Sequence, residues 1–253
     1  MIKLKELNIE FGSRKLLNVV SGIFSRGELT ALIGRNGSGK STLLRSICGF
    51  FTNYSGEIQI EGKNIRDLSK LQMAKKISFV TTERPRIANL SCRDIVSLGR
   101  SPYTDWMGRL LKTDKEIIDD ALESVGMLAL ADRSMDNLSD GECQRIMIAR
   151  AIAQDTPAII LDEPTSFLDL ANRYEVVTLL KKLANQRNKS IIFSTHELDI
   201  ALDKADKIAL IDDEKLIHKN VEEMIKSGLI QKMFHSSGDY INRLLNMILE
   251  SRK

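Results

Sequence analysis

The sequence predicts an α/β fold that has a parallel sheet as its core, antiparallel strands near the N-terminus and a helical insertion in the middle. Residues 158–161 and 190–193 are continuous apolar runs, which are typical of parallel strands covered on both faces. Residues 56–62 alternate polar and apolar side chains between two glycines, which indicates an antiparallel strand with one face in solvent. Residues 87–153 carry mostly helical spacing, so the sequence places a helical insertion between the two kinds of strand.

The chain has the length of one large domain or of two closely joined ones. Its 253 residues contain no internal repeat and no linker rich in Pro, Gly and Ser. We therefore expect a single domain over residues 1–253, with its core in residues 1–86 and 154–253 and the insertion in residues 87–153.

Bulk composition disfavours several classes of protein. The formal charge of +3 is nearly balanced and the sequence has no dense Lys/Arg stripe, so we expect no nucleic-acid partner. The three cysteines, Cys48, Cys92 and Cys143, are widely spaced and indicate reduced thiols in a reducing compartment. The N-terminus lacks the apolar segment of a signal peptide, and no apolar run reaches the ~18–20 residues of a membrane span. We expect a soluble, cytoplasmic chain, so any membrane role must come through a partner.

Residues 34–41 match the phosphate-loop pattern G-x-x-x-x-G-K-[S/T] at every position. Residues 28–33 resemble the strand that enters such a loop, and residues 42–48 the helix whose N-terminus faces the anion. In such a loop the backbone N–H groups surround a phosphate chain, Lys40 supplies a cation for the β- and γ-phosphates, and Ser41 offers a hydroxyl to Mg²⁺. The predicted nucleotide-binding residues here are Gly34, Asn36, Gly37, Ser38, Gly39, Lys40, Ser41 and Thr42. The alternative, a chance glycine-rich turn, is disfavoured by the strand and the helix on either side.

A well-defined helix of the middle segment is predicted to begin at Thr113. Thr113 and Glu116 match a capping box, and apolar residues follow at helical spacing as far as Gly126. This helix is the main support for a helical insertion.

Residues 138–142 open another helix, which stops before Pro157. Ser139 and Glu142 match a capping box, so a well-capped helix is one interpretation. The other is a second anion site, formed by the Ser139 hydroxyl, the backbone amide of Gly141 and the helix dipole. On that interpretation the chain carries two phosphate-binding elements that lie far apart in sequence.

Acidic residues and a histidine follow two of the predicted strands. Asp162 and Glu163 come directly after the apolar run 158–161, at the strand end where open α/β sheets bind ligands. Asp162 is placed to hold Mg²⁺, and Glu163 to orient and polarise an attacking water. His196 ends the next strand and can hydrogen-bond the γ-phosphate or its leaving oxygen. The alternatives are an ordinary acidic strand-to-loop junction and a capping or core histidine. With Lys40, we expect Glu163 and His196 to be the catalytic residues.

Together these motifs resemble the ATP-binding subunit of an ABC transporter. The resemblance covers nearly the whole chain, and the motifs stand in family order: phosphate loop, signature 138–142, acids Asp162 and Glu163, loop 166–169 and His196. It implies an ATPase with a P-loop NTPase core, an N-terminal antiparallel β subdomain and an inserted α-helical subdomain. It also implies ATP and Mg²⁺ as cofactors.

The resemblance further implies a head-to-tail homodimer. ATP on the phosphate loop of one subunit would be covered by Ser139 and Gly141 of the other. Phe11 would stack on the adenine; the alternative is an aromatic buried in a strand. Asp140 stands where the family usually has a small residue. We expect it to face solvent, because a carboxylate near a triphosphate is unfavourable.

Residues 97–103 carry a finer resemblance, to the import branch that serves iron–siderophore, haem and cobalamin permeases. In that branch the segment lies near the surface that docks the membrane subunit, and Tyr103 and Trp106 are candidates for that contact. Packing inside the insertion is the alternative. The resemblance implies integral permease subunits as partners, an external solute-binding protein only indirectly, and a position on the inner face of the cell membrane.

One loop departs from the family pattern. Where the family usually has a glutamine that reaches Mg²⁺, the chain has Thr82, followed by Glu83. Thr82 is too short to reach as far, and Glu83 brings charge without an amide donor. A poorly hydrolysing ATP switch is therefore one alternative function. Another is a soluble ABC-type ATPase acting on ribosomes or DNA, which the single phosphate loop and the lack of sustained heptads disfavour.

Overall fold

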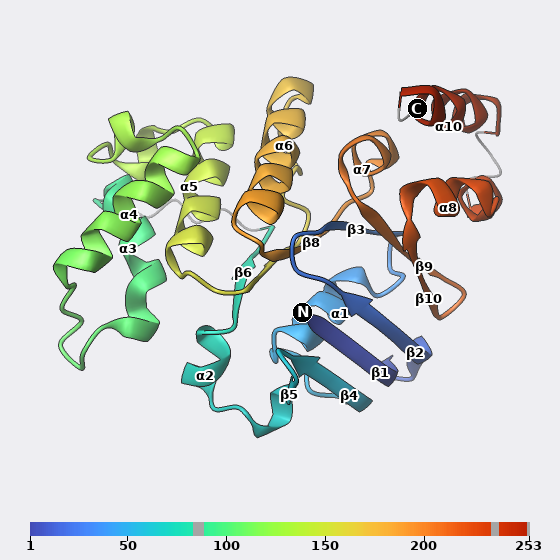
Figure 1. Ribbon diagram of the computed structural model, residues 1–253, viewed down its shortest axis with the longest axis horizontal. Helices are drawn as coiled ribbons and strands as arrows, with labels where there is room; N and C mark the ends of the chain where they lie inside the picture. The colour runs from blue at the N-terminus through green and yellow to red at the C-terminus, as the bar shows by residue number, and fades with distance from the viewer. Residues whose placement is uncertain (83–88, 234–237, 252–253) are drawn as a thin grey trace.

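The computed structural model describes residues 1–82, 89–233 and 238–251, which form two sheets and the helices around them (Figure 1). The antiparallel sheet has the strand order β2-β1-β4-β5 and comprises β1 (Ile2–Phe11), β2 (Arg14–Phe24), β4 (Tyr54–Ile60) and β5 (Lys63–Asn64). The second sheet has the order β10-β9-β3-β8-β7-β6 and comprises β3 (Leu29–Gly34), β6 (Ile77–Val80), β7 (Ala158–Leu161), β8 (Ser190–Ser194), β9 (Lys207–Asp212) and β10 (Lys215–Asn220). Its neighbouring strands are parallel, except that β10 is antiparallel to β9. The predicted α/β class with an N-terminal antiparallel sheet is confirmed.

Helices lie on both sides of the parallel sheet. The described helices are α1 (Lys40–Ile47), α2 (Lys70–Ala74), α3 (Cys92–Ser97), α4 (Lys112–Ser124), α5 (Asp140–Ala153), α6 (Leu170–Gln186), α7 (Leu198–Lys204), α8 (Val221–Lys226), α9 (Leu229–Met233) and α10 (Gly238–Ser251). Figure 1 shows α5, α6 and α7 on one side of this sheet, and α1 between it and the antiparallel sheet. The middle segment is helical as predicted, and its helices α3, α4 and α5 gather at one end of the molecule.

The two faces of the parallel sheet contribute to two separate hydrophobic cores. In β3, Ala31 and Ile33 pack into the core that contains the insertion and helices α6 and α7. Leu32 points the other way, into the core formed with α1 and the antiparallel sheet. Because both faces are covered, every residue of β3 is buried, which explains why the parallel strands have continuous apolar sequences.

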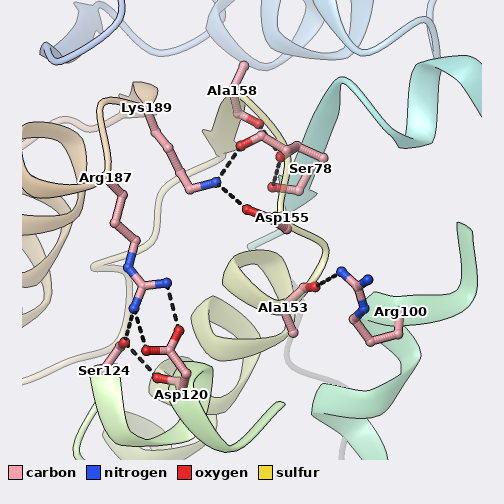
Figure 2. Close-up of polar contacts among 10 residues, drawn as sticks. Ser78, Arg100, Asp120, Ser124, Ala153, Asp155, Ala158, Arg187 and Lys189 are labelled. Carbon is pink, nitrogen blue, oxygen red and sulfur yellow. Dashed lines mark hydrogen bonds and ion pairs between the residues drawn. The ribbon is translucent and has the colours of Figure 1, made fainter. Parts of the chain in front are cut away.

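Two basic side chains, Arg187 and Lys189, fasten segments around the insertion to the remainder of the chain (Figure 2). Arg187, at the end of α6, donates to both carboxylate oxygens of Asp120 at 2.8 and 3.0 Å and to the Ser124 hydroxyl at 2.7 Å, which ties α6 to α4. Lys189 donates to the Asp155 carboxylate at 3.1 Å, just after the end of α5. Apolar burial does not depend on direction, whereas hydrogen bonds do. These polar contacts therefore help to fix how the joined segments lie against each other.

The start of α4 differs from the prediction. The helix begins at Lys112, and Thr113 lies inside its first turn rather than at its cap. The Leu111 N–H donates to the Asp114 carboxylate at 2.9 Å. Asp114 takes this position because its other oxygen accepts from Arg100 Nε at 2.8 Å, a contact outside the helix that local capping rules do not reveal.

Arg100 and Asp114 form a buried ion pair inside the insertion. Their side chains are only 7 % and 4 % exposed. Arg100 also donates to the carbonyl of Ala153 at 2.9 Å, which joins the short 3₁₀ segment Leu98–Tyr103 to the end of α5. Burial alone would raise the pKa of Asp114, but the Leu111 N–H and the Arg100 guanidinium outweigh it and hold that pKa below its ordinary value.

We expect Asp114→Asn to lower the free energy of unfolding by about 3–5 kcal/mol at pH 7, because it leaves the Arg100 guanidinium buried without its counter-charge. A carboxyl whose pKa is depressed in the folded state stabilises the fold above its unfolded pKa of about 3.9 and loses that effect as the pH falls. The difference between wild type and variant should therefore shrink below about pH 4. Urea unfolding measured between pH 3 and pH 7 checks both points.

Asp119→Asn is the matched control on the same helix. Asp119 pairs with Arg93, but the two side chains are 48 % and 38 % exposed, so we expect its loss to cost less than about 1 kcal/mol. Equal effects of the two substitutions would contradict a special role of the buried pair.

Candidate functional site

The C-terminal ends of three adjacent strands, β3, β8 and β7, meet at one edge of the parallel sheet. Each strand continues into a segment that carries predicted site residues: the phosphate loop after β3, Asp162 and Glu163 after β7, and His196 after β8. Open α/β sheets bind ligands at this edge. The strand order therefore brings together motifs that lie more than a hundred residues apart in sequence.

The phosphate loop turns tightly between β3 and α1. Gly37 and Gly39 have φ values of 74° and 99°, a left-handed conformation that glycine adopts without steric cost. Gly39 is the N-cap of α1 and provides no side-chain hydrogen bond, so the first N–H groups of the helix have no capping side chain. An uncapped helix N-terminus that follows a glycine-rich loop is suited to binding phosphate.

The ammonium of Lys40 lies against this loop. Its Nζ donates to the carbonyls of Gly34 at 2.8 Å and Arg35 at 3.3 Å, and the residue is only 7 % exposed. Burial lowers the pKa of Lys40, while the carboxylates of Glu163 and Asp162 partly oppose that shift. A phosphate in front of the loop would supply the anion that this poorly solvated cation needs.

Hydroxyl groups surround Asp162. One oxygen of its carboxylate accepts from Ser41 at 3.0 Å and from Ser194 at 2.7 Å. The two residues predicted to hold Mg²⁺, Ser41 and Asp162, are thus in direct contact. A hydroxyl and a carboxylate oxygen suit Mg²⁺, which commonly uses one or two carboxylates and takes further oxygens from phosphate and water. The part of the chain that the structure describes has no cluster of three or more His, Cys, Asp or Glu side chains that could hold a metal without such help.

Glu163 has a strained backbone and a constrained side chain. Its φ is 47°, which is uncommon for a residue other than glycine, and its N–H donates to the Ser194 hydroxyl at 2.8 Å. One carboxylate oxygen accepts from the Ser166 hydroxyl at 2.9 Å, and the other lies 3.9 Å from His196 Nδ1. Neither Ser166 nor Ser194 was identified from the sequence as a contact of this carboxylate pair.

An open cleft of about 650 Å³ lies in front of these groups. Its lining comprises Phe11, Arg14, Leu16, Asn36, Gly37, Gly39, Lys40, Ser41, Thr42, Glu163 and His196. Phe11 is 64 % exposed, so it is not a buried strand aromatic, and its ring stacks on Phe51 with the centroids 6.2 Å apart. Of the other predicted loop residues, Ser38 and Gly34 line smaller adjoining clefts.

Ser139 and Gly141 lie on the insertion, and neither belongs to the lining of this cleft. Ser139 caps α5: its N–H donates to Glu142 at 2.8 Å, and its hydroxyl accepts from the Glu142 N–H at 3.3 Å. The capping interpretation is therefore confirmed, and it leaves the second anion site as a prediction. Asp140 is exposed, as expected.

The loop between core and insertion begins with a tethered threonine. The Thr82 hydroxyl donates to the backbone carbonyl of Asp162 at 3.0 Å, so Thr82 contacts the main chain of the residue predicted to hold Mg²⁺. Glu83 lies outside the described residues.

The two aromatic candidates of the insertion have different surroundings. Tyr103 lies between the insertion and the core, with the Arg100 guanidinium 4.0 Å and the Lys75 ammonium 5.1 Å from its ring centroid. Trp106 is 92 % exposed, so packing inside the insertion is excluded for this residue. Of the two, Trp106 is the more open to contact with another molecule, and Tyr103 is half-buried. Among the described helices, none combines the length and the apolar character needed to cross a bilayer.

Comparison with known proteins finds one matching family model and several similar proteins. The sequence model of the family described as ABC transporter matches residues 17–166. The uncharacterized ABC transporter ATP-binding protein MJ0873 of Methanocaldococcus jannaschii is 39 % identical, over 92 % of this chain and 81 % of that protein. The petrobactin import ATP-binding protein YclP of Bacillus subtilis is 34 % identical over 92 % of each chain. A dimeric structure of the ATP-binding cassette MJ0796 in a post-hydrolysis state with ADP and Pi superposes with a TM-score of 0.74 and 27 % identity, over 87 % of this chain and 99 % of that one.

Proposed function

This chain belongs to the ABC transporter family and is an ATPase of the ABC type, and we propose that it powers a membrane permease that imports an iron–siderophore complex, haem or cobalamin. The observation that carries the proposal is that Lys40, Ser41 and Glu163 line one cleft beside an exposed aromatic ring, with the buried Asp162 accepting a hydrogen bond from Ser41. The import branch is supported by the motif at residues 97–103 and by the petrobactin import described for YclP.

The chain's own residues divide the work of hydrolysis. Phe11 stacks on the base, and the loop amides and Lys40 hold the phosphates. Ser41 and Asp162 would hold Mg²⁺, which, when bound, neutralises charge on the phosphate oxygens. Glu163 orients the attacking water and accepts its proton, and His196 donates a hydrogen bond to the γ-phosphate.

A second copy of the chain completes the site in this proposal. Ser139 and Gly141 lie away from the chain's own cleft, at the start of α5, where Ser139 is exposed and Gly141 is buried. Placed by the partner against the γ-phosphate, the Ser139 hydroxyl and the helix N-terminus would add donors to an anion that one subunit leaves open. The dimeric state of the superposing MJ0796 cassette supports this arrangement.

A groove between core and insertion is the proposed docking surface for the permease. The groove has a volume of about 960 Å³, and Phe50, Phe79, Leu98 and Pro102 are among its lining residues. Phe50 and Leu98 are 69 % and 50 % exposed. An apolar groove of this kind fits a short helix of an integral subunit and would hold the chain on the inner face of the membrane. A solute-binding protein outside the cell would act only through the permease, and no nucleic acid takes part.

We expect the tagged full chain to co-purify with an integral permease from membranes, and ATP turnover to be higher with the permease than without it. Phe50→Asp should abolish co-purification and leave basal turnover intact, because it places a charge in the apolar groove. Met247→Asp is the control, since Met247 is equally exposed at 63 % but lies on α10. Recovery of ribosomes or DNA in place of a permease would contradict the proposal. Negligible turnover even with the permease present would favour the ATP switch.

A further inference from the structure

Arg173, in the first turns of α6, bridges two loops of the site without lining the cleft. Its Nε donates to the carbonyl of Leu168 at 2.6 Å. Its Nη1 lies 2.7 Å from Glu197 Oε1. One planar guanidinium therefore joins the segment before α6 to the segment that follows β8.

Each of these loops supplies one contact of the Glu163 carboxylate. The loop that ends at Leu168 carries Ser166, whose hydroxyl donates to one carboxylate oxygen at 2.9 Å. The loop that contains Glu197 carries His196, whose Nδ1 lies 3.9 Å from the other oxygen. Together, these contacts and the two loops form a closed ring. One half runs from Glu163 through Ser166 and along its loop to Arg173. The other half returns from Arg173 through Glu197 and the adjacent His196.

Backbone strain and a buried carboxylate show why the two loops need a residue that holds them together. Glu163 and Phe167 have φ values of 47° and 63°, conformations that non-glycine residues hold only when their surroundings enforce them. The Glu197 side chain is 8 % exposed, and a carboxylate so buried requires a cation nearby. Arg173 meets both needs, since it neutralises Glu197 and anchors the strained loop at Leu168.

We propose that Arg173 is a positioning residue for ATP hydrolysis. It holds the two loops so that Ser166 and His196 fix the orientation of the Glu163 carboxylate toward the attacking water. The inference rests on the role of Glu163 in the proposed function. Because Arg173 does not line the cleft, its loss should slow the hydrolytic step and leave nucleotide binding unchanged.

The test compares steady-state hydrolysis of Mg-ATP by the full chain and its variants. Arg173→Met alone leaves Glu197 buried without its cation and could fail to fold, so the decisive variant is Arg173→Met/Glu197→Gln, which removes both charges. We expect kcat to fall at least tenfold, with KM and the unfolding midpoint close to wild type. Arg173→Lys should give an intermediate kcat, because lysine can keep the ion pair but not both contacts at once.

Arg187→Met/Asp120→Asn is the matched control, because Arg187 lies at the other end of α6, is equally exposed at 33 % and also makes an ion pair at 2.8 Å. We expect its kcat to stay within twofold of wild type. A kcat within twofold of wild type for Arg173→Met/Glu197→Gln, or an equal loss in the control, would overturn the inference. Glu163→Gln is measured alongside. If it hydrolyses ATP like wild type, the role that the proposed function gives to Glu163 fails, and the inference fails with it. If it is inactive while the Arg173 variant is normal, only the positioning role fails.

Discussion

Glu163→Gln is expected to lower ATP turnover by on the order of 10²- to 10⁴-fold, the usual contribution of a general base. Glutamine keeps the shape of the side chain and can still accept from the Ser166 hydroxyl, which lies 2.9 Å from the carboxylate. It cannot take a proton from water. Nucleotide affinity should therefore stay within about twofold of wild type while hydrolysis stops. Single-turnover hydrolysis and equilibrium binding of ATP separate the two effects.

Glu175→Gln serves as the control for this substitution. Glu175 lies on the surface of α6, where it pairs with Arg145 and is 58 % exposed, so its neutralisation should leave turnover unchanged. If Glu163→Gln retained wild-type turnover, another group would have to activate the water.

Lys40→Ala is expected to weaken ATP binding by on the order of 10²-fold or more. The loss of one partner of a buried charged contact costs about 2–5 kcal/mol, and 1.4 kcal/mol corresponds to a tenfold change in affinity. Folded stability should change little, since burial already lowers the pKa of Lys40 and disfavours its charge in the nucleotide-free chain. Calorimetric titration with Mg-ATP and urea unfolding measure the two quantities.

Lys189→Met is the control for Lys40→Ala, and we expect it to show the opposite effects on stability and on ATP affinity. Lys189 is also buried, at 8 % exposed, but its ammonium donates to Asp155 and to the carbonyl of Thr156, away from the cleft (Figure 2). Its loss should lower stability and leave ATP affinity unchanged. Equal losses of affinity in the two variants would show that Lys40 acts through folding rather than through phosphate.

The parts of the site that the sequence predicts are those that local chemistry dictates. The phosphate loop is recognisable because glycines, Lys40 and Ser41 must stand at fixed spacing between a strand and a helix. Asp162 and His196 are recognisable because each follows an apolar strand.

The remaining contacts depend on strand order and side-chain direction. Ser194 and Thr82 reach the Asp162 segment only because β8 and β6 lie on either side of β7. Phe11 could not be placed from strand alternation, since the register between β1 and β2 shifts near Glu10. The predicted start of α4 was wrong for a similar reason, because Asp114 forms an ion pair with Arg100, which lies outside the helix.

Sedimentation of the Glu163→Gln chain with ATP and Mg²⁺ tests the central claim most directly, namely that two copies enclose the nucleotide between the phosphate loop of one and the Ser139 end of the other. The account predicts a dimer with Mg-ATP, a monomer without nucleotide, and no dimer when a bulky Ser139→Trp substitution blocks the second wall. A chain that stays monomeric with Mg-ATP, both alone and with its permease, would contradict it.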